Sequence, residues 1–288
     1  MEKLLERLLI FFIGIPLIIA LVLFLPFCRH LPLNIVIIIF SAVGSVEFSM
    51  MLEKKQLHIT KKEAFLFGAL APAALTLSIS FNFPGWTVPV IITAGAAWIL
   101  FSRVFSGPEK IETAASHLAA GFSVLIYPGL FMYWLVKMTT WENSGVIILI
   151  FLMIVLGSDS AAWLFGNLFG ANNRGIIPAS PNKSIAGFIG GLAGAVIISL
   201  SSVLIVPGIF TTRINSLSAV LAAVILGICT GIATALGDLA ESAIKRSCDI
   251  KDSGKLMPGR GGVLDSIDSI AAAAPVFFIL YSALFINI

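Results

Sequence analysis

Residues 145–165 read Gly145-Val-Ile-Ile-Leu-Ile-Phe-Leu-Met-Ile-Val-Leu-Gly-Ser-Asp159-Ser-Ala-Ala-Trp-Leu-Phe165, and Asp159 is their one ionisable side chain. A helix needs about 20 predominantly apolar residues to cross a bilayer, and this stretch has that length and character. Of the 288 residues, 58% are apolar and only 11% are charged, whereas soluble domains carry about 25% charged residues. We therefore expect an all-α integral membrane protein whose main partner is the lipid bilayer.

Similar apolar stretches recur along the chain and predict about nine transmembrane helices. The first competes with a cleaved signal peptide, but it lacks an A-x-A-type cleavage site and is long enough to span. The third is short and contains Pro72. We treat the spans as one membrane domain, with N-terminal helices in residues 1–144 and C-terminal catalytic helices with cytosol-facing loops in residues 145–288. The expected spans are 8–27, 33–52, 64–81, 86–106, 115–137, 145–165, 184–206, 215–237 and 267–287.

Pairs of glycines four positions apart occur in two of these spans. Such pairs let helix backbones approach each other closely in membranes. We expect helix contacts at Gly187 and Gly191, at Gly190 and Gly194, and at Gly227 and Gly231.

The distribution of Lys and Arg predicts the orientation, because cytoplasmic loops carry an excess of these residues. With the N-terminus in the cytosol, nine spans place 15 basic residues on the cytosolic side. The opposite side then holds three, namely Arg29, Lys137 and Arg213. We expect a multi-pass protein of the inner (cytoplasmic) membrane with its C-terminus outside. The net charge of +3 does not suggest a nucleic-acid partner.

Ionisable residues gather at the cytosolic ends of the later spans, and such residues within or beside a span are costly and usually functional. Asp159 lies inside an apolar span, and Lys183 lies at the start of the next. Asp238 follows another span, while Asp265 and Asp268 open the last. The alternative is a set of interfacial carboxylates that face water, but that does not explain Asp159.

Helical spacing brings several of these side chains to common faces. Asp265 and Asp268 are three residues apart, which places them on one face of a helix. A second face carries Asp238, Glu241, Ser242 and Lys245. Carboxylates from two helices suit Mg²⁺, which prefers oxygen ligands. We therefore expect metal ligands among Asp159, Asp238, Asp265 and Asp268.

A glycine-rich basic segment separates the two groups of carboxylates. Residues 251–262 read Lys-Asp-Ser-Gly-Lys-Leu-Met-Pro-Gly-Arg-Gly-Gly. Glycines let the backbone approach a ligand, and consecutive N–H groups can hold phosphate. The alternative is a flexible loop that binds lipid head groups. The flanking carboxylates favour the phosphate site.

These residues resemble the signature of the phosphatidate cytidylyltransferase family, also called CDP-diacylglycerol synthases. The matching segments are Ser158-Asp159-Ser-Ala-Ala-Trp163, Phe169-Gly170, Ser180-Pro181-Asn182-Lys183-Ser184-x2-Gly187-x2-Gly190-Gly191, Gly237-Asp238-Leu-x-Glu241-Ser242-Ala-Ile-Lys245-Arg246, Lys251-Asp252-x-Gly254, Pro258-Gly259-Arg260-Gly261-Gly262 and Asp265-x2-Asp268. The motifs cover residues 158–269, and the first half of the chain matches only in hydropathy.

The resemblance implies transfer of CMP from CTP to phosphatidate, with release of pyrophosphate, by a Mg²⁺-dependent homodimer whose active site faces the cytosol. It implies that Asp238 and Asp265 hold the metal. The residues assigned to catalysis are Asp238, Asp265, Lys245, Arg246, Lys251 and Asp252. Those assigned to substrate binding are Ser180, Asn182, Lys183, Ser184, Ser242, Arg260, Gly261 and Gly262.

Three positions depart from the family pattern. The family usually has His at the position of Arg260, Arg at that of Ser266 and Glu at that of Ala186. Arg260 keeps a hydrogen-bond donor but loses a neutral acid/base. We expect these changes to affect substrate preference, while the carboxylates assigned to the metal are intact.

Two other functions compete with this assignment. A lipid-alcohol kinase, such as a polyprenol kinase, would use a nucleotide on a membrane-embedded alcohol but should lack the full signature of basic residues, glycines and aspartates. A transporter would place its polar residues near the bilayer midplane, often in two similar halves. Here the polar residues gather at one interface.

Overall fold

The computed structural model describes residues 10–212 and 217–286, and within those ranges every regular element is a helix. Lys3, Arg7 and Arg213, which entered the predicted orientation, lie outside the described residues. The longer helices are α2 (Ile15–Phe24), α3 (Phe27–Glu53), α4 (Lys61–Ser80), α5 (Thr87–Phe101), α7 (Ala114–Val124), α8 (Phe131–Met138), α9 (Ser144–Phe169), α10 (Ile185–Ile205), α11 (Ala219–Ser247) and α12 (Leu264–Phe285). The short elements are η1 (Ile10–Gly14), α6 (Pro108–Glu112), η2 (Leu125–Leu130) and η3 (Pro207–Ile209).

Seven helices in the described part of the chain are long and apolar enough to cross a membrane. They are α3, α4, the continuous run Ala114–Met138, α9, α10, α11 and α12. The expected spans 8–27 and 86–106 correspond to shorter apolar helices, at Phe12–Phe24 and Thr87–Phe101. The first ends at Phe24 before Pro26, because a proline disfavours helical geometry in the residue before it, here Leu25. The second ends at Phe101, before the expected end at residue 106. The all-helical, multi-pass fold is confirmed, while the number nine and the orientation stay predictions.

The chain forms two compact units. The first contains residues Met1–Thr140 and Ser247–Ile267, and the second contains Trp141–Arg246 and Asp268–Ile288. The first unit thus combines the N-terminal helices with the glycine-rich segment, while the second holds α9, α10 and most of α11 and α12. The predicted division of the chain into residues 1–144 and 145–288 follows the order of the helices along the sequence, and it stays a prediction.

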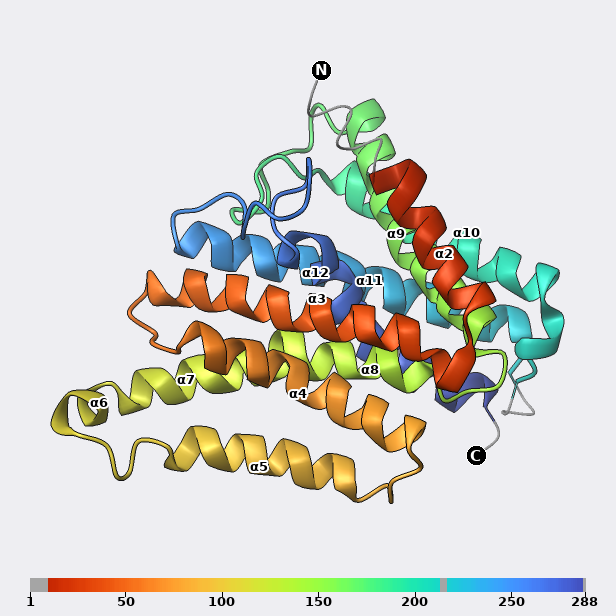
Figure 1. The fold of residues 1–288 in the computed structure, drawn as a ribbon. Coiled ribbons are helices and arrows are strands. Elements are labelled where there is room, and N and C mark those ends of the chain that lie inside the picture. Colours follow the sequence, from red (N-terminus) through yellow and green to blue (C-terminus); the bar gives the residue numbers. More distant parts are fainter. Residues whose placement is uncertain (1–9, 213–216, 287–288) are drawn as a thin grey trace. The chain divides into compact units, whose positions relative to one another are not determined.

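In the first unit α3 and α4 pack side by side (Figure 1). Thr60 and Glu63 form a capping box at the start of α4, which satisfies two N–H groups there. The helix continues through Pro72, although proline lacks the N–H that the carbonyl of Gly68 needs. The Ser41 hydroxyl of α3 lies 2.7 Å from that carbonyl oxygen. This side-chain contact satisfies the freed backbone group, which a helix in lipid requires.

In the second unit glycines bring α9, α10 and α11 together. A Cβ atom at Gly187 would lie 2.8 Å from the carbonyl oxygen of Ala162 in α9. One at Gly191 would lie 3.0 Å from the carbonyl oxygen of Ser158, and one at Gly227 would lie 2.8 Å from Cα of Val196 in α10. Contact distances this short leave no room for a side chain. The helix contacts predicted from glycine spacing are confirmed, and they hold Asp159 of α9 beside the start of α10.

Helix α11 extends ten residues beyond the expected span 215–237, to Ser247. Residues 238–247, which follow the expected span, form the last part of this helix. The Ser242 hydroxyl donates to Oδ1 of Asp238 at 3.3 Å, and Lys245 pairs with Glu241. Both contacts join residues four apart, so the predicted common face of these four side chains is confirmed.

Candidate active site

The second unit contains a cluster of carboxylates. Asp159 of α9 lies close enough to Asp238 of α11 and Asp268 of α12 for electrostatic interaction with both, and it accepts a hydrogen bond from Ser269. Asp268 is 7% exposed and also interacts with Asp238. Three of the four carboxylates predicted as metal ligands are therefore brought together from three helices.

Close packing of α11 against α12 places Asp238 beside Asp268. A Cβ atom at Gly237 would lie 2.7 Å from the carbonyl oxygen of Asp268, and it would also meet Cβ of Ala272. Glycine at this position is thus required by the contact between the two helices. In the Gly237-Asp238 pair of the sequence signature, the glycine therefore allows α11 to pack against α12, and the aspartate supplies a carboxylate to the cluster.

Two lysines balance part of this negative charge. The Nζ atom of Lys183 lies 2.6 Å from Oδ2 of Asp238, and each side chain is about one third exposed (33% and 35%). Lys245 pairs with Glu241, whose side chain is fully buried and which also contacts Asp268. Both ammonium groups are therefore held by carboxylates of the cluster, and water reaches Lys183.

The loop before α10 positions Lys183 through backbone hydrogen bonds. The N–H of Lys183 donates to the carbonyl oxygen of Ser180 at 3.0 Å. Ser184 is the N-cap of α10, and its side-chain oxygen accepts from the N–H of Gly187 at 3.0 Å. The predicted substrate-binding residue Ser184 is thus buried and used for capping, whereas Asn182 is exposed.

Asp265 organises the glycine-rich loop in the first unit. Its Oδ2 atom accepts hydrogen bonds from the N–H of Ser253 at 2.8 Å, the hydroxyl of Ser253 at 2.9 Å and the N–H of Gly262 at 2.7 Å. The N–H of Gly262, which was expected to face phosphate, is therefore occupied by a carboxylate in this structure. The predicted phosphate site on this loop stays a prediction.

Arg260 lies in a tight turn of this loop. The N–H groups of Arg260 and Gly261 both donate to the carbonyl oxygen of Met257 at 3.1 Å. The N–H of Met257 donates to the carbonyl oxygen of Gly261 at 2.8 Å. Gly261 has a φ of +108°, which glycine adopts without the strain of a side chain. Arg260 is exposed at this turn. Of the residues assigned to catalysis, Lys251 and Asp252 of this loop and Arg246 of α11 are also exposed.

One candidate residue was missed from the sequence. Glu47 of α3 is 2% exposed, and its Oε2 atom accepts a hydrogen bond from the N–H of Leu264 at 2.8 Å. It lies within the expected span 33–52. The rule that singled out Asp159, an ionisable residue inside an apolar span, applies equally to Glu47.

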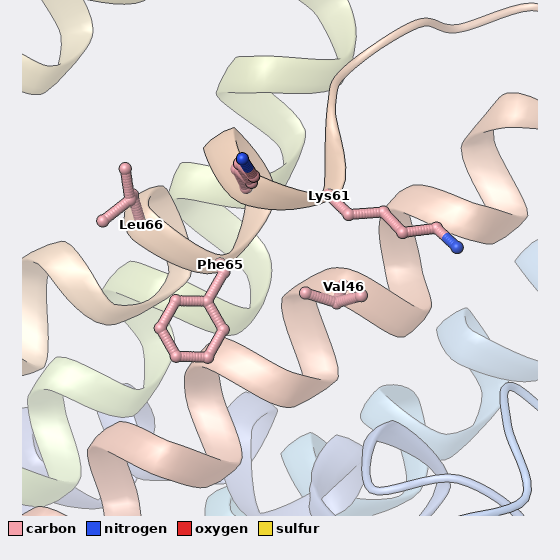
Figure 2. Close-up of a pocket in the computed structure, with 5 residues that line it drawn as sticks. Val46, Lys61, Phe65 and Leu66 are labelled. Carbon is pink, nitrogen blue, oxygen red and sulfur yellow. The ribbon is translucent and has the colours of Figure 1, made fainter.

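A groove of about 460 Å³ lies elsewhere in the first unit, beside the start of α4. Figure 2 shows Val46 on α3 facing Phe65 and Leu66 on α4, with Lys61 at the edge. Lys62 completes the lining. The residues that line it include no predicted site residue.

Across residues 10–212 and 217–286, no three His, Cys, Asp or Glu side chains are arranged closely enough to hold a metal ion. The carboxylates of the second unit nevertheless have the chemistry that Mg²⁺ prefers, because all their donor atoms are oxygens. The donor type therefore fits a magnesium ion, and binding of the ion stays a prediction.

Comparison with known proteins defines the class of enzyme. A model described as the cytidylyltransferase family matches residues 5–284. The chain belongs to that family and is a nucleotidyltransferase.

Relatives with assigned names carry the comparison further. The phosphatidate cytidylyltransferase of Bacillus subtilis (strain 168) is 29% identical over 266 residues, which cover 90% of this chain and 91% of that protein. The phosphatidate cytidylyltransferase of Brucella suis biovar 1 (strain 1330) is 32% identical over 247 residues, 84% of this chain and 83% of that protein. The uncharacterized protein YnbB of Escherichia coli (strain K12) is 34% identical over 206 residues, 70% of this chain and 65% of that protein. The resemblance drawn from the motifs is confirmed.

Proposed function

We propose that this chain transfers CMP from CTP to phosphatidate and forms CDP-diacylglycerol and pyrophosphate. The observation that carries the proposal is the match of the whole chain to the cytidylyltransferase family, shared with phosphatidate cytidylyltransferases that align along more than four fifths of their length. The helical membrane fold agrees with a lipid substrate, which reaches the site from the bilayer.

The chemistry sets clear requirements for the site. A phosphate oxygen of phosphatidate attacks the α-phosphorus of CTP, and the bond from that phosphorus to the bridging oxygen of pyrophosphate breaks. A phosphomonoester is largely dianionic at neutral pH, with a second pKa of about 6, so the nucleophile needs no strong general base. Both reactants are anions, and the site must supply fixed positive charge.

Lys183 and Lys245 supply such charge in the second unit. Because each is paired with a carboxylate, its ammonium group is oriented before the substrates bind, which lowers the cost of reorganisation in the transition state. In the first unit, Lys251 and Arg260 are exposed, and the resemblance assigns Lys251 to catalysis and Arg260 to substrate binding. Arg is suited to two-point contacts with phosphate.

The grouping of carboxylates in the second unit supports a divalent cation. Asp159 and Asp268 each interact with Asp238, and like charges this close repel one another. Mg²⁺ bound by Asp238, with Asp159 and Asp268 beside it, would offset this repulsion and would neutralise the phosphates of CTP. The resemblance adds Asp265 as a second required carboxylate.

We further propose that the protein lies in the inner membrane, with its active site facing the cytosol, where CTP is available. The count of 15 basic residues against three supports this orientation. The homodimer rests on the resemblance to the family. A lipid-alcohol kinase and a transporter are not favoured, because the family match extends over residues 5–284.

The direct test uses the purified protein in detergent with CTP and Mg²⁺. Pyrophosphate release should begin when phosphatidate is added and should be absent without it. An Asp238→Asn variant that folds normally provides the matched control. Release of pyrophosphate that is independent of phosphatidate, or no release in its presence, would contradict the proposal.

A further inference from the structure

Glu47 carries a buried carboxylate at a place where the sequence signature has no counterpart. It lies on α3, its side chain is 2% exposed, and in the described part of the chain it forms no ion pair with Lys or Arg. Burying a carboxylate without a cation is costly unless hydrogen bonds stabilise it. The partners of Glu47 therefore indicate what it does.

In the described part of the chain, Glu47 contacts the N–H of Leu264, which directly follows the glycine-rich loop, and the hydroxyl of Ser253 within that loop, which it shares with Asp265. The N–H of Leu264 donates to Oε2 at 2.8 Å, and the hydroxyl of Ser253 lies 3.2 Å from the same atom. Leu264 is the first residue of α12, and the first N–H groups of a helix have no partner within it. Glu47 thus holds both ends of the loop, more than 200 residues away in the sequence.

The same carboxylate accounts for two glycines. A Cβ atom at Gly254 would lie 2.7 Å from Cδ of Glu47, and one at Gly262 would meet Oε2. Neither glycine has a positive φ, so backbone conformation does not require glycine at either position. At Gly254 the space for a side chain is filled mainly by the Glu47 carboxylate, and at Gly262 it is filled by that carboxylate together with the Ser253 hydroxyl and the backbone nitrogen of Gly254.

Glu47 and Asp265 act on the same serine. The Ser253 hydroxyl lies 2.9 Å from Oδ2 of Asp265 and 3.2 Å from Oε2 of Glu47. Its N–H also donates to Asp265. The two carboxylates therefore fix the loop together, and displacement of Glu47 would release one side of Ser253 and the first turn of α12 that carries Asp265.

We propose that Glu47 is a positioning residue for cytidylyl transfer, which holds residues 251–264 and the start of α12 so that Asp265 and the basic residues of the loop keep their places. This rests on the proposed function for its kinetic consequence, whereas its structural consequence can be measured without any activity. Glu47 touches neither substrate and acts through the loop.

The first experiment measures hydrogen exchange of the purified full-length protein by mass spectrometry. In Glu47→Ala the peptide covering residues 251–264 should exchange about 10- to 100-fold faster, because hydrogen bonds to a charged group are lost. Peptides from α4 should be unchanged. Glu53→Ala is the matched control, since Glu53 lies on the same helix and is exposed, and it should match the wild type throughout. Faster exchange across α3 and α4 as well would mean a general structural role and would overturn the proposal.

Kinetics provide the second readout. Glu47→Ala should lower kcat/KM for CTP by about 10- to 100-fold, whereas Glu47→Gln should recover part of this loss because its amide oxygen still accepts from Leu264 and Ser253. If Glu47→Ala does not fold, Glu47→Gln replaces it in the comparison. Residues 251–264 of Glu47→Gln should then exchange faster than in the wild type but more slowly than expected for a loop without these hydrogen bonds. Wild-type kinetics in the folded Glu47→Ala protein would refute the positioning role. If the wild-type protein showed no activity, the proposed cytidylyl transfer would be refuted. The hydrogen-exchange result would then decide by itself whether Glu47 holds residues 251–264.

A double-mutant cycle tests the contact itself. Gly254→Ala places a methyl group against the Glu47 carboxylate and should lower kcat/KM by about tenfold or more. In the Glu47→Ala background the two nearest contacts are removed and only Cα of Gly262 remains, at 3.2 Å, so the same change should cost less than about threefold, a coupling expected of residues in contact. Strictly multiplicative effects would show that Gly254 is required for another reason, and the proposal would fail.

Discussion

Substitution of Gly237 by alanine should reduce catalysis through the packing of α11 against α12. The added Cβ would lie 2.7 Å from the carbonyl oxygen of Asp268, whereas uncrowded heavy atoms lie at least about 3.5 Å apart. The added Cβ would also lie 2.5 Å from Cβ of Ala272, and this closer contact requires the helices to separate by roughly 1 Å. Asp238 follows Gly237 directly, so the separation moves its carboxylate away from Asp268.

The expected losses of stability and of kcat in Gly237→Ala follow from two effects. Overpacking a well-packed contact costs about 1–3 kcal/mol of stability, and misplacing a catalytic group by about 1 Å can cost about 100-fold in rate. The variant should thus retain its fold with a lowered Tm in detergent and show a loss of kcat of about 100-fold. The assay is phosphatidate-dependent release of pyrophosphate, combined with thermal unfolding.

Gly208→Ala is the matched control, because a Cβ at Gly208 would meet nothing within 4 Å. It should leave both Tm and kcat unchanged. If Gly237→Ala behaved in the same way, with full activity and the wild-type Tm, the close packing of α11 on α12 would not be what positions Asp238.

Three further predictions concern the signature residues and the topology. Asp238→Asn and Asp265→Asn should each abolish turnover while the protein still folds, and activity above a few per cent of wild type in either would refute its assignment to the metal. Arg260→Ala should lower kcat/KM for CTP by about 2–4 kcal/mol because a transition-state charge contact is lost, and Ser266→Arg in that background should restore part of it; near-normal kinetics in Arg260→Ala would mean that this side chain does not contact CTP. Alkaline phosphatase fused to the C-terminus should be active, and an inactive fusion there, with an active one in residues 248–263, would reverse the orientation.

The sequence was sufficient for the class of fold because the bilayer limits the possible structures. Only helices and closed barrels satisfy every backbone group in lipid, so apolar stretches such as residues 145–165 predict helices directly. Glycines at positions such as 187 and 191 predicted helix contacts because small residues within a span let two helix backbones approach closely. Span lengths were less certain, and α11 extends to Ser247 because its polar last turns are stabilised by side-chain pairs four residues apart.

The contents of the candidate site were only partly predictable. Asp159, Asp238 and Asp268 come together as the pattern of carboxylates indicated. Gly262 and Asp265 belong to one motif, but the motif does not show that the carboxylate accepts from the Gly262 N–H. The contact of Glu47 with Ser253 could not be seen in the sequence, because no periodicity or motif links these two residues. The exposure of Lys183 and its pairing with Asp238 likewise depend on the fold of the loop before α10.

The fate of the phosphates of CTP tests the central claim most directly. CTP labelled at the α-phosphorus and CTP labelled at the γ-phosphorus are incubated separately with the purified protein and phosphatidate, and the lipid and aqueous products are then separated. Cytidylyl transfer predicts that the α-label enters the lipid as CDP-diacylglycerol and that the γ-label is released as pyrophosphate. Transfer of the γ-label to a lipid, with the α-label left in soluble CDP, would identify a lipid kinase and contradict cytidylyl transfer.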